Sequence, residues 1–593
     1  MKKIVFILAA AVALASCKSG GEKSGASEPN AGLATLLDQY YEESLQLFPI
    51  NATYQGDKRY NDLLPAEFTD SYRAKLKDFY KKYLDGLAKF DRAGLNENDQ
   101  ASYDILKHDA EIALEGLSFN DNYIPFNQFY GTTLTMGQLG SGDGAQPFKT
   151  VEDYDKWLKR ATAFNAWADS AILYFRKGMA ANFVLPKSIV VKIIPQMTAM
   201  VIADPTKSLF YGPVSKFPST FSDADKKRLT DSFAAVIKTQ LVPSYKKLGD
   251  FLQTEYLPKA RTTSGVSALP DGKKYYEYLV RQQTTTNKTP EEIYNTGLAE
   301  VKRIRGIMDS VKNAVNFKGD LPAFFEYMRT NKIFMPYKSP EEVLNAFRAI
   351  QAKIQPHLSE MFNKTPKTKF EIRQTEAFRA ESASAEYNQG TPDGSRPGIF
   401  YIPILDATKF NITSGMESLF LHEAIPGHHY QISLQQEDTS LPKFRRFGAH
   451  NAYVEGWALY CESLGKELGL YKDPYQYMGA LGDEIHRAIR LVVDVAIHTK
   501  GMTREEAIKY MMDNEAISEQ GATAEIERYM VIPGQALGYK IGALKIRELR
   551  NKYQQQLGSK FNLAAFHDEF LSSGSMPLDL VEKRMDVWAA KQK

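Results

Sequence analysis

The chain has 593 residues with ordinary shares of hydrophobic (43%) and charged (24%) side chains, so its length allows a large core or several domains. Its formal net charge of +3 is close to balance and gives no reason to expect nucleic acid or an anionic surface as a partner. The two cysteines, Cys17 and Cys461, are too few for a disulfide framework. The 33 Tyr and 33 Phe residues suit an enzyme whose cleft is lined with amphipathic rings.

The N-terminus has the pattern of a bacterial export signal. Lys2 and Lys3 precede an apolar run over residues 4–14, which is too short to span a bilayer. The run ends in Leu-Ala-Ser-Cys, which resembles a lipobox, where Cys17 is acylated and becomes the mature N-terminus. Residues 18–32 are rich in Gly, Ser and Lys and are expected to form a flexible tether. We therefore expect a signal at 1–17 and a lipid anchor that holds the protein at the cell envelope; an ordinary cleaved secretory signal is the alternative.

Helical periodicity dominates the chain from residue 33 onward. A first amphipathic stripe begins at Leu33 and is expected to break at Asn51. Apolar residues recur at intervals of three and four in further segments, which predicts helices over residues 71–90, 97–117, 151–179, 224–252 and 290–315. Thr289-Pro290 and Ser339-Pro340 are typical helix starts. Residues 120–144 are rich in Gly, Asn and Thr and are predicted to be a loop region beside a cleft.

Two strands are predicted later in the chain. Residues 369–375 alternate in character, and residues 398–402 form a short apolar run; a turn-rich loop is expected over 388–397. The second strand suits either a sheet edge that pairs with an extended peptide or a core strand. The remainder is predicted to be helical, with breaks at Gly501 and Gly521. No Pro-rich linker divides residues 33–593, so we expect one mainly α catalytic domain, with two lobes around a deep cleft and a small sheet near the site.

The stretch Leu-His-Glu-Ala-Ile-Pro-Gly-His-His-Tyr, residues 421–430, concentrates metal-binding chemistry. His422, His428 and His429 are imidazoles, which together with a carboxylate suit a borderline cation such as Zn²⁺. Glu423 stands beside the first His, where a metal-assisted hydrolase needs a general base. A second carboxylate, Glu455, follows in Tyr-Val-Glu-Gly-Trp-Ala-Leu-Tyr. Its neighbours predict a buried helix, where an unpaired carboxylate would be costly, so we expect a metal ligand.

This stretch departs from the usual zinc motif, because Pro426 stands where the second His is normally found. On an unbroken helix His429 would lie about 10.5 Å along the axis from His422, whereas two ligands of one Zn²⁺ have nitrogens only about 3–3.5 Å apart. A regular helix therefore cannot carry the site. Pro426-Gly427 is expected to break the helix and bring one of the two later imidazoles, His428 or His429, back toward His422.

Three motifs resemble a known family: His-Glu-x-x-Pro-Gly-His-His, Tyr-Val-Glu-Gly-Trp-Ala-Leu-Tyr, and Arg-Tyr-x-x-x-Pro-Gly-Gln-Ala-Leu-x-Tyr-Lys. They are similar to those of the bacterial family catalogued as domain of unknown function 885, which includes lipoproteins and is grouped with the zinc metallopeptidases. The resemblance covers most of the chain after the tether and is strongest over residues 398–547. It implies a helical fold like that of zinc metallopeptidases and one Zn²⁺ per chain.

A more distant likeness concerns the angiotensin-converting type of peptidyl-dipeptidase and the thermostable bacterial carboxypeptidases. The residues after His429 are similar to those after the second zinc His of these enzymes, which favours His429 over His428, whereas the Gly-His step favours His428. Glu455 follows at a spacing close to that of their third ligand. Arg528 and Tyr529 resemble their Arg-Tyr pair, whose Tyr stabilises an oxyanion; a core Tyr is the alternative.

Four further residues are candidates for substrate contacts or for support of the metal ligands. His450 shortly precedes Glu455 and is expected near the metal. His498 ends an i, i+4 series with Arg490 and Asp494, which suits either a polar network beside the site or a charge ladder on a helix surface. Tyr539 and Lys540 are weaker candidates.

These patterns together predict a zinc-dependent hydrolase at the cell envelope, and the likeness to the helical zinc peptidases implies short peptides as its substrates. His422, His429 (or His428) and Glu455 hold the metal, Glu423 moves the proton, and Tyr529 stabilises the oxyanion. Two alternatives remain. One is a metal hydrolase of another amide, such as a cell-wall fragment. The other is a lipid-anchored binding protein with a degenerate site. Short peptides and the membrane are the expected partners, and nucleic acid is not.

Overall fold

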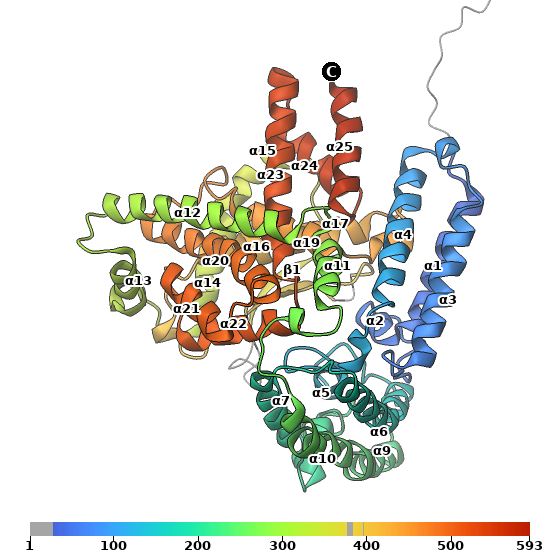
Figure 1. The fold of residues 1–593 in the computed structure, drawn as a ribbon. Coiled ribbons are helices and arrows are strands. Elements are labelled where there is room, and N and C mark those ends of the chain that lie inside the picture. The colour runs from blue at the N-terminus through green and yellow to red at the C-terminus, as the bar shows by residue number, and fades with distance from the viewer. Residues whose placement is uncertain (1–27, 376–383, 395) are drawn as a thin grey trace, which may run out of the picture.

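The computed structural model describes residues 28–375, 384–394 and 396–593 (Figure 1). The predicted signal at 1–17 with its lipobox Cys17, and most of the tether at 18–32, lie outside the described residues. Within the part that is described, no helix combines the length and the hydropathy that crossing a membrane requires.

The fold is mainly α with one small sheet, as the sequence predicts. The N-terminal helices lie side by side along one edge of the molecule (Figure 1): α1 (Ala31–Leu47), α2 (Pro49–Tyr54), α3 (Asp70–Leu87) and α4 (Glu97–Gly116). A second group follows: α5 (Thr132–Gly140), α6 (Val151–Ala180), α7 (Lys187–Ala199), α8 (Gly212–Ser215), α9 (Asp223–Val236) and α10 (Val242–Phe251). The chain continues through α11 (Gly272–Thr284), α12 (Pro290–Ala314), α13 (Leu321–Thr330), α14 (Pro340–Ile354) and α15 (Leu358–Met361).

The sheet interrupts the helices in the middle of the chain. It consists of β1 (Phe370–Gln374), β2 (Glu386–Asn388) and β3 (Gly398–Ile402), in the order β1-β3-β2. β1 runs parallel to β3 with Phe370 opposite Gly398, and β2 runs antiparallel with Glu386 opposite Tyr401. Both predicted strands are therefore confirmed. β3 is the central strand, so the expectation of a free peptide-binding edge there is wrong, and the alternative of a core strand holds.

The C-terminal part is helical to its end: α16 (Met416–Glu423), α17 (His428–Glu437), α18 (Lys443–Arg446), α19 (Asn451–Glu462), α20 (Pro474–Thr499), α21 (Arg504–Asn514), α22 (Glu519–Val531), α23 (Leu537–Leu557), α24 (Leu563–Ser572) and α25 (Leu578–Gln592). Gly501 follows the end of α20 as predicted, whereas Gly521 lies inside α22, where the sequence predicted a break.

The helix starts follow their local chemistry. Thr289 and Glu292 form a reciprocal capping box at the start of α12, and the Ser339 side chain caps α14. Both predicted helix starts are therefore confirmed. Two local expectations are wrong. Asn51 lies inside the short helix α2, because the break comes earlier, at Pro49. The predicted loop over 120–144 contains α5, where Gly140 packs closely against the rings of Trp157 and Phe210.

Two large hydrophobic cores hold the fold. One joins α5–α10 with α12, α13 and α20–α22, and the other joins α1, α4 and α14 with the sheet, α16, α17, α19 and α23–α25. Helix α20 is buried along most of its second half and packs along α12. Helix α19 packs along α23, where a Cβ atom on Gly456 would lie 2.5 Å from Gly542 Cα. The missing side chains let these two backbones touch, and this contact positions Glu455.

Candidate metal centre

The metal-binding stretch folds as two helices joined by a break. α16 ends at Glu423 and α17 begins at His428. Pro426 cannot continue a helical hydrogen-bond ladder, and a Cβ atom on Gly427 would lie 1.9 Å from the backbone oxygen of His422. The break brings the rings of His422 and His428 to 4.8 Å between centroids, nearly perpendicular at 89°. The predicted interruption at Pro426-Gly427 is therefore confirmed.

A carboxylate from α19 completes this group. Glu455 Oε2 lies 3.5 Å from His422 Nε2 and 3.5 Å from His428 Nε2. Ligand atoms around a tetrahedral Zn²⁺, each at about 2.1 Å, are about 3.4 Å apart, so these distances fit one shared cation. Glu455 Oε2 is buried and has no hydrogen-bond partner among the described residues. A metal ion would satisfy such an orphaned carboxylate oxygen between two imidazoles.

Glu423 faces the same space from the end of α16. It offers a donor atom that lies within 4.8 Å of donor atoms of His422 and His428. Burial raises the pKa of the Glu423 carboxyl, and Glu455 adds to this, while the two imidazoles and a backbone hydrogen bond from Tyr387 lower it. The arrangement leaves Glu423 able to accept and return a proton beside the three-residue cluster of His422, His428 and Glu455.

The orientation of His422 is set from behind. Its Nδ1 lies 2.7 Å from Glu462 Oε1, and both side chains are buried. Arg487 approaches the same Glu462 oxygen at 3.9 Å. Burial disfavours the protonated imidazole, but the Glu455 and Glu462 carboxylates outweigh it and raise the pKa of His422 to about 10. A carboxylate on the far ring nitrogen directs Nε2 toward a metal and makes it a better ligand.

His429, which the sequence preferred as the second ligand, points elsewhere. Its Nδ1 lies 3.0 Å from the Tyr387 hydroxyl and 3.4 Å from Ser433 Oγ, and its ring packs on Phe370 at 4.8 Å. Burial lowers the pKa of His429 to about 4. The structure therefore places His428, and not His429, beside His422 and Glu455. Neighbouring residues on a helix point about 100° apart, so only one of the two rings can face His422.

Tyr529 is not free to stabilise an oxyanion. Its hydroxyl accepts from Arg490 Nε at 2.9 Å and donates to Glu525, and its side chain is buried. Tyr539 is better placed, since its ring lies parallel to that of His422 with centroids 6.4 Å apart and Arg490 lies over it at 4.7 Å. None of the described residues forms a hydrogen bond with the Tyr539 hydroxyl. Tyr539 therefore lies beside His422, whereas the Tyr529 hydroxyl is already occupied.

His450 and His498 were expected to support the metal ligands, but their contacts lie with other residues. His450 Nε2 lies 2.9 Å from Asp109 Oδ1 of α4, and its Nδ1 lies 3.2 Å from Ser575 Oγ. His498 is fully buried: its Nδ1 accepts from the Val266 backbone and its Nε2 donates to the Tyr529 carbonyl, both at 3.0 Å. It is a core residue, so the expectation of a charge ladder on a helix surface is wrong.

Arg528 and Lys540 are likewise held by other partners. Arg528 Nη2 donates to Gln535 Oε1 at 2.8 Å, and its guanidinium lies over the exposed ring of Phe129. Lys540 Nζ is buried between Glu484 at 2.8 Å and Glu300 at 3.0 Å. Its ion pairs belong to a pocket described below.

Sequence reasoning missed Glu462 and Arg487, which stand behind His422, and Tyr387, which holds the His429 ring away from the cluster. Glu462 had a usable signal, because it lies seven residues after Glu455 and therefore on the same face of one helix. Arg487 and Tyr387 come from distant parts of the chain, and their spacing carries no such signal. Tyr387 lies on β2, so the small sheet borders the site as predicted.

Fold and site together define a mainly helical protein with two imidazoles and two carboxylates gathered at a broken helix. Residues 49–585 match the family described as "Bacterial protein of unknown function (DUF885)", and the chain belongs to this family. No match was found among curated proteins.

Solved structures resemble the chain over nearly its whole length. One, described as "the putative lipoprotein from Colwellia psychrerythraea", has 28% identity and a TM-score of 0.87, covering 94% of this chain and 99% of its own. Another, "a putative lipoprotein of unknown function from Shewanella oneidensis", has 21% identity and a TM-score of 0.72, covering 94% and 100%. A carboxypeptidase of Pyrococcus furiosus covers 95% and 99% at 10% identity and a TM-score of 0.38, a likeness too low to argue from.

Proposed function

We propose that this protein is a zinc-dependent hydrolase that cleaves peptide bonds in short peptides. The observation that carries the proposal is the position of Glu455 Oε2, orphaned and 3.5 Å from the Nε2 atoms of both His422 and His428. These three residues would hold one Zn²⁺, the donor set that catalytic zinc sites use. When bound, the metal supplies an activated water and polarises the substrate carbonyl.

The chain's own residues would perform the remaining steps. Glu423 takes a proton from the attacking water and delivers it to the leaving amine. The Tyr539 hydroxyl donates a hydrogen bond to the oxyanion that develops on the substrate carbonyl oxygen. Glu462 holds the His422 ring in place throughout. Burial raises the pKa of the Glu423 carboxyl, which makes it a stronger proton acceptor than an exposed carboxylate.

We further propose that Cys17 is lipid-anchored and holds the protein at the cell envelope. The lipobox-like sequence before Cys17 supports this, as do the related structures, which are themselves described as lipoproteins. Mass spectrometry of the mature N-terminus would test it: an acylated Cys17 is expected, and an unmodified N-terminus at another residue would refute it.

The test of function begins with the metal content of the full-length protein in detergent. We expect one zinc per chain, lost in His428→Ala and in Glu455→Ala but kept in His429→Ala, which is the matched control from the same helix turn. Glu423→Gln should keep the metal and abolish cleavage of a short-peptide library. Wild-type protein without zinc after supplementation, or an active Glu423→Gln variant, would overturn the proposal.

A further inference from the structure

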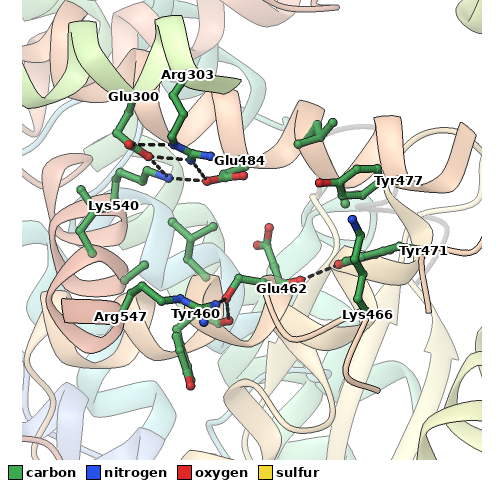
Figure 2. A pocket seen from close by; sticks show the side chains of 16 residues that line it. Glu300, Arg303, Tyr460, Glu462, Lys466, Tyr471, Tyr477, Glu484, Lys540 and Arg547 are labelled. Carbon is green, nitrogen blue, oxygen red and sulfur yellow. Dashed lines mark hydrogen bonds and ion pairs between the residues drawn. The ribbon is translucent and has the colours of Figure 1, made fainter. Parts of the chain in front are cut away.

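A cavity of about 350 Å³ lies between α12, α19, α20 and α23 (Figure 2). It borders the C-terminal end of α19, whereas Glu455 lies near the start of that helix. Neither His422 nor His428 nor Glu455 lines it. Its volume falls at the small end of the range for ligand pockets in proteins, about 300–1,000 Å³. The cavity is therefore a separate space with room for a small molecule.

The charged side chains on one wall of this cavity are paired with one another. Lys540 Nζ bonds to Glu484 and Glu300, and Arg303 bridges the same two carboxylates at 2.5 Å and 2.8 Å. Figure 2 shows these four side chains gathered on one side of the pocket. Two cations face two anions, so this wall offers no free charge to a ligand.

Two further cations line the cavity, Arg547 from α23 and Lys466 from the segment after α19. Lys466 Nζ lies 4.1 Å from the centre of the Tyr477 ring, and the Arg547 guanidinium lies 5.1 Å from that of Tyr460. Arg547 also donates to Ser463 Oγ. Across the described ranges of the chain, neither Lys466 nor Arg547 has a carboxylate within ion-pair distance. Both cations therefore remain available to an anion.

The rest of the lining is apolar or aromatic. It comprises Leu459, Leu481, Leu544, Ala480 and Ala543, together with the rings of Tyr460, Tyr471 and Tyr477. A lining that combines cations with apolar side chains suits a ligand that is itself amphipathic.

We propose that this pocket binds the carboxylate end of an apolar molecule about the size of a dipeptide. Lys466 and Arg547 would take the carboxylate through charge-assisted hydrogen bonds, and the leucine and tyrosine side chains would enclose the apolar part. That the ligand is a peptide rather than another small carboxylate rests on the proposed function, because hydrolysis of short peptides releases small peptides with a free carboxylate near the pocket.

The pocket touches the group that orients a metal ligand. Glu462 lines the cavity, and its Oε1 lies 2.7 Å from His422 Nδ1. Its second oxygen, Oε2, is buried without a hydrogen-bond partner in the described part of the chain. An occupant that contacts Glu462 would change how that carboxylate holds His422. Binding in the pocket should therefore change zinc affinity, and zinc should change ligand affinity by the same factor.

Calorimetry with the full-length protein would test the binding site. The Glu423→Gln variant, stripped of metal with a chelator, prevents turnover of the probes leucyl-leucine and leucyl-leucinamide. Leucyl-leucine should bind, and the amide, which lacks the carboxylate, should not. Lys466→Met and Arg547→Gln should each weaken binding at least tenfold, about 1.4 kcal/mol. Lys509→Met and Arg348→Gln are matched controls, because they remove exposed cations from α21 and α14 and should leave binding unchanged.

The outcomes separate this proposal from the proposed function. If Lys466→Met and Arg547→Gln bind leucyl-leucine as tightly as the parent protein, while His428→Ala loses that binding, the dipeptide binds at the metal cluster. This result would overturn the pocket site and leave the proposed peptidase activity intact. Pocket-dependent binding without any hydrolysis by the wild-type protein would uphold the site and refute the peptidase. Zinc affinity that is identical with and without saturating leucyl-leucine would overturn the linkage through Glu462.

Discussion

The hydrogen bond between Glu462 and His422 gives a sharp test of the metal centre. Replacing Glu462 by Gln keeps an oxygen acceptor of similar size but removes the negative charge that faces His422 Nδ1 at 2.7 Å. The carboxylate is only 5% exposed, so water does not screen that charge. Losing a carboxylate behind a metal-bound imidazole costs about 10- to 100-fold in metal affinity, which is about 1.4–2.7 kcal/mol.

Competition with a fluorescent zinc chelator would measure this loss directly, without any assumption about substrate. Glu548→Gln is the matched control: it makes the same chemical change at an exposed site on α23, where the residue pairs with Lys545. Circular dichroism would confirm that both variants are folded. If Glu462→Gln binds zinc as tightly as the wild type while His428→Ala loses it, Glu462 does not support the metal ligand and the reasoning fails.

Three further predictions concern catalysis, packing and pH. Tyr539→Phe should lower kcat by about 10²–10³-fold with little change in zinc content. Tyr529→Phe breaks a buried network and should mainly lower the melting temperature. Equal kcat in the wild type and Tyr539→Phe would exclude the oxyanion role. Gly456→Ala should destabilise the protein by a few kcal/mol, because its Cβ would lie 2.5 Å from Gly542 Cα and overfill a tight contact. An unchanged midpoint of urea unfolding would contradict this contact. Burial raises the pKa of Asp494 from 3.8 to about 7, so the folded form holds a proton more tightly than the unfolded form. Its contribution to stability is therefore complete below about pH 4 and is lost as the pH rises through about 7. Asp494→Asn should remove up to about 3 kcal/mol of that fall between pH 5 and 8 in urea unfolding, and an unaltered pH profile would refute it.

Much of the fold could be predicted because its signals are local. Helix starts such as Thr289 and Ser339 follow from side chains that cap their own backbone, and amphipathic stripes mark the buried face of each helix. The errors arose where packing overrode composition. The Gly and Thr residues over 120–144 predicted a loop, yet α5 forms there, and its Gly140 fits against the rings of Trp157 and Phe210. β3 lies at the centre of its sheet because two other segments pair with it, which no short window reveals.

The sequence by itself determined the chemical composition of the site and one rule of its geometry. His422, Glu423 and Glu455 were identifiable from residue type and spacing, and the position of Pro426 required a broken helix. Only the tertiary structure shows that His428, and not His429, lies beside Glu455, and that the Tyr529 hydroxyl is held by Arg490. These choices depend on which way a ring points after the chain has bent, and on partners such as Glu462, Tyr387 and Arg490. Those partners come from separate helices and a strand, and packing of the cores brings them together.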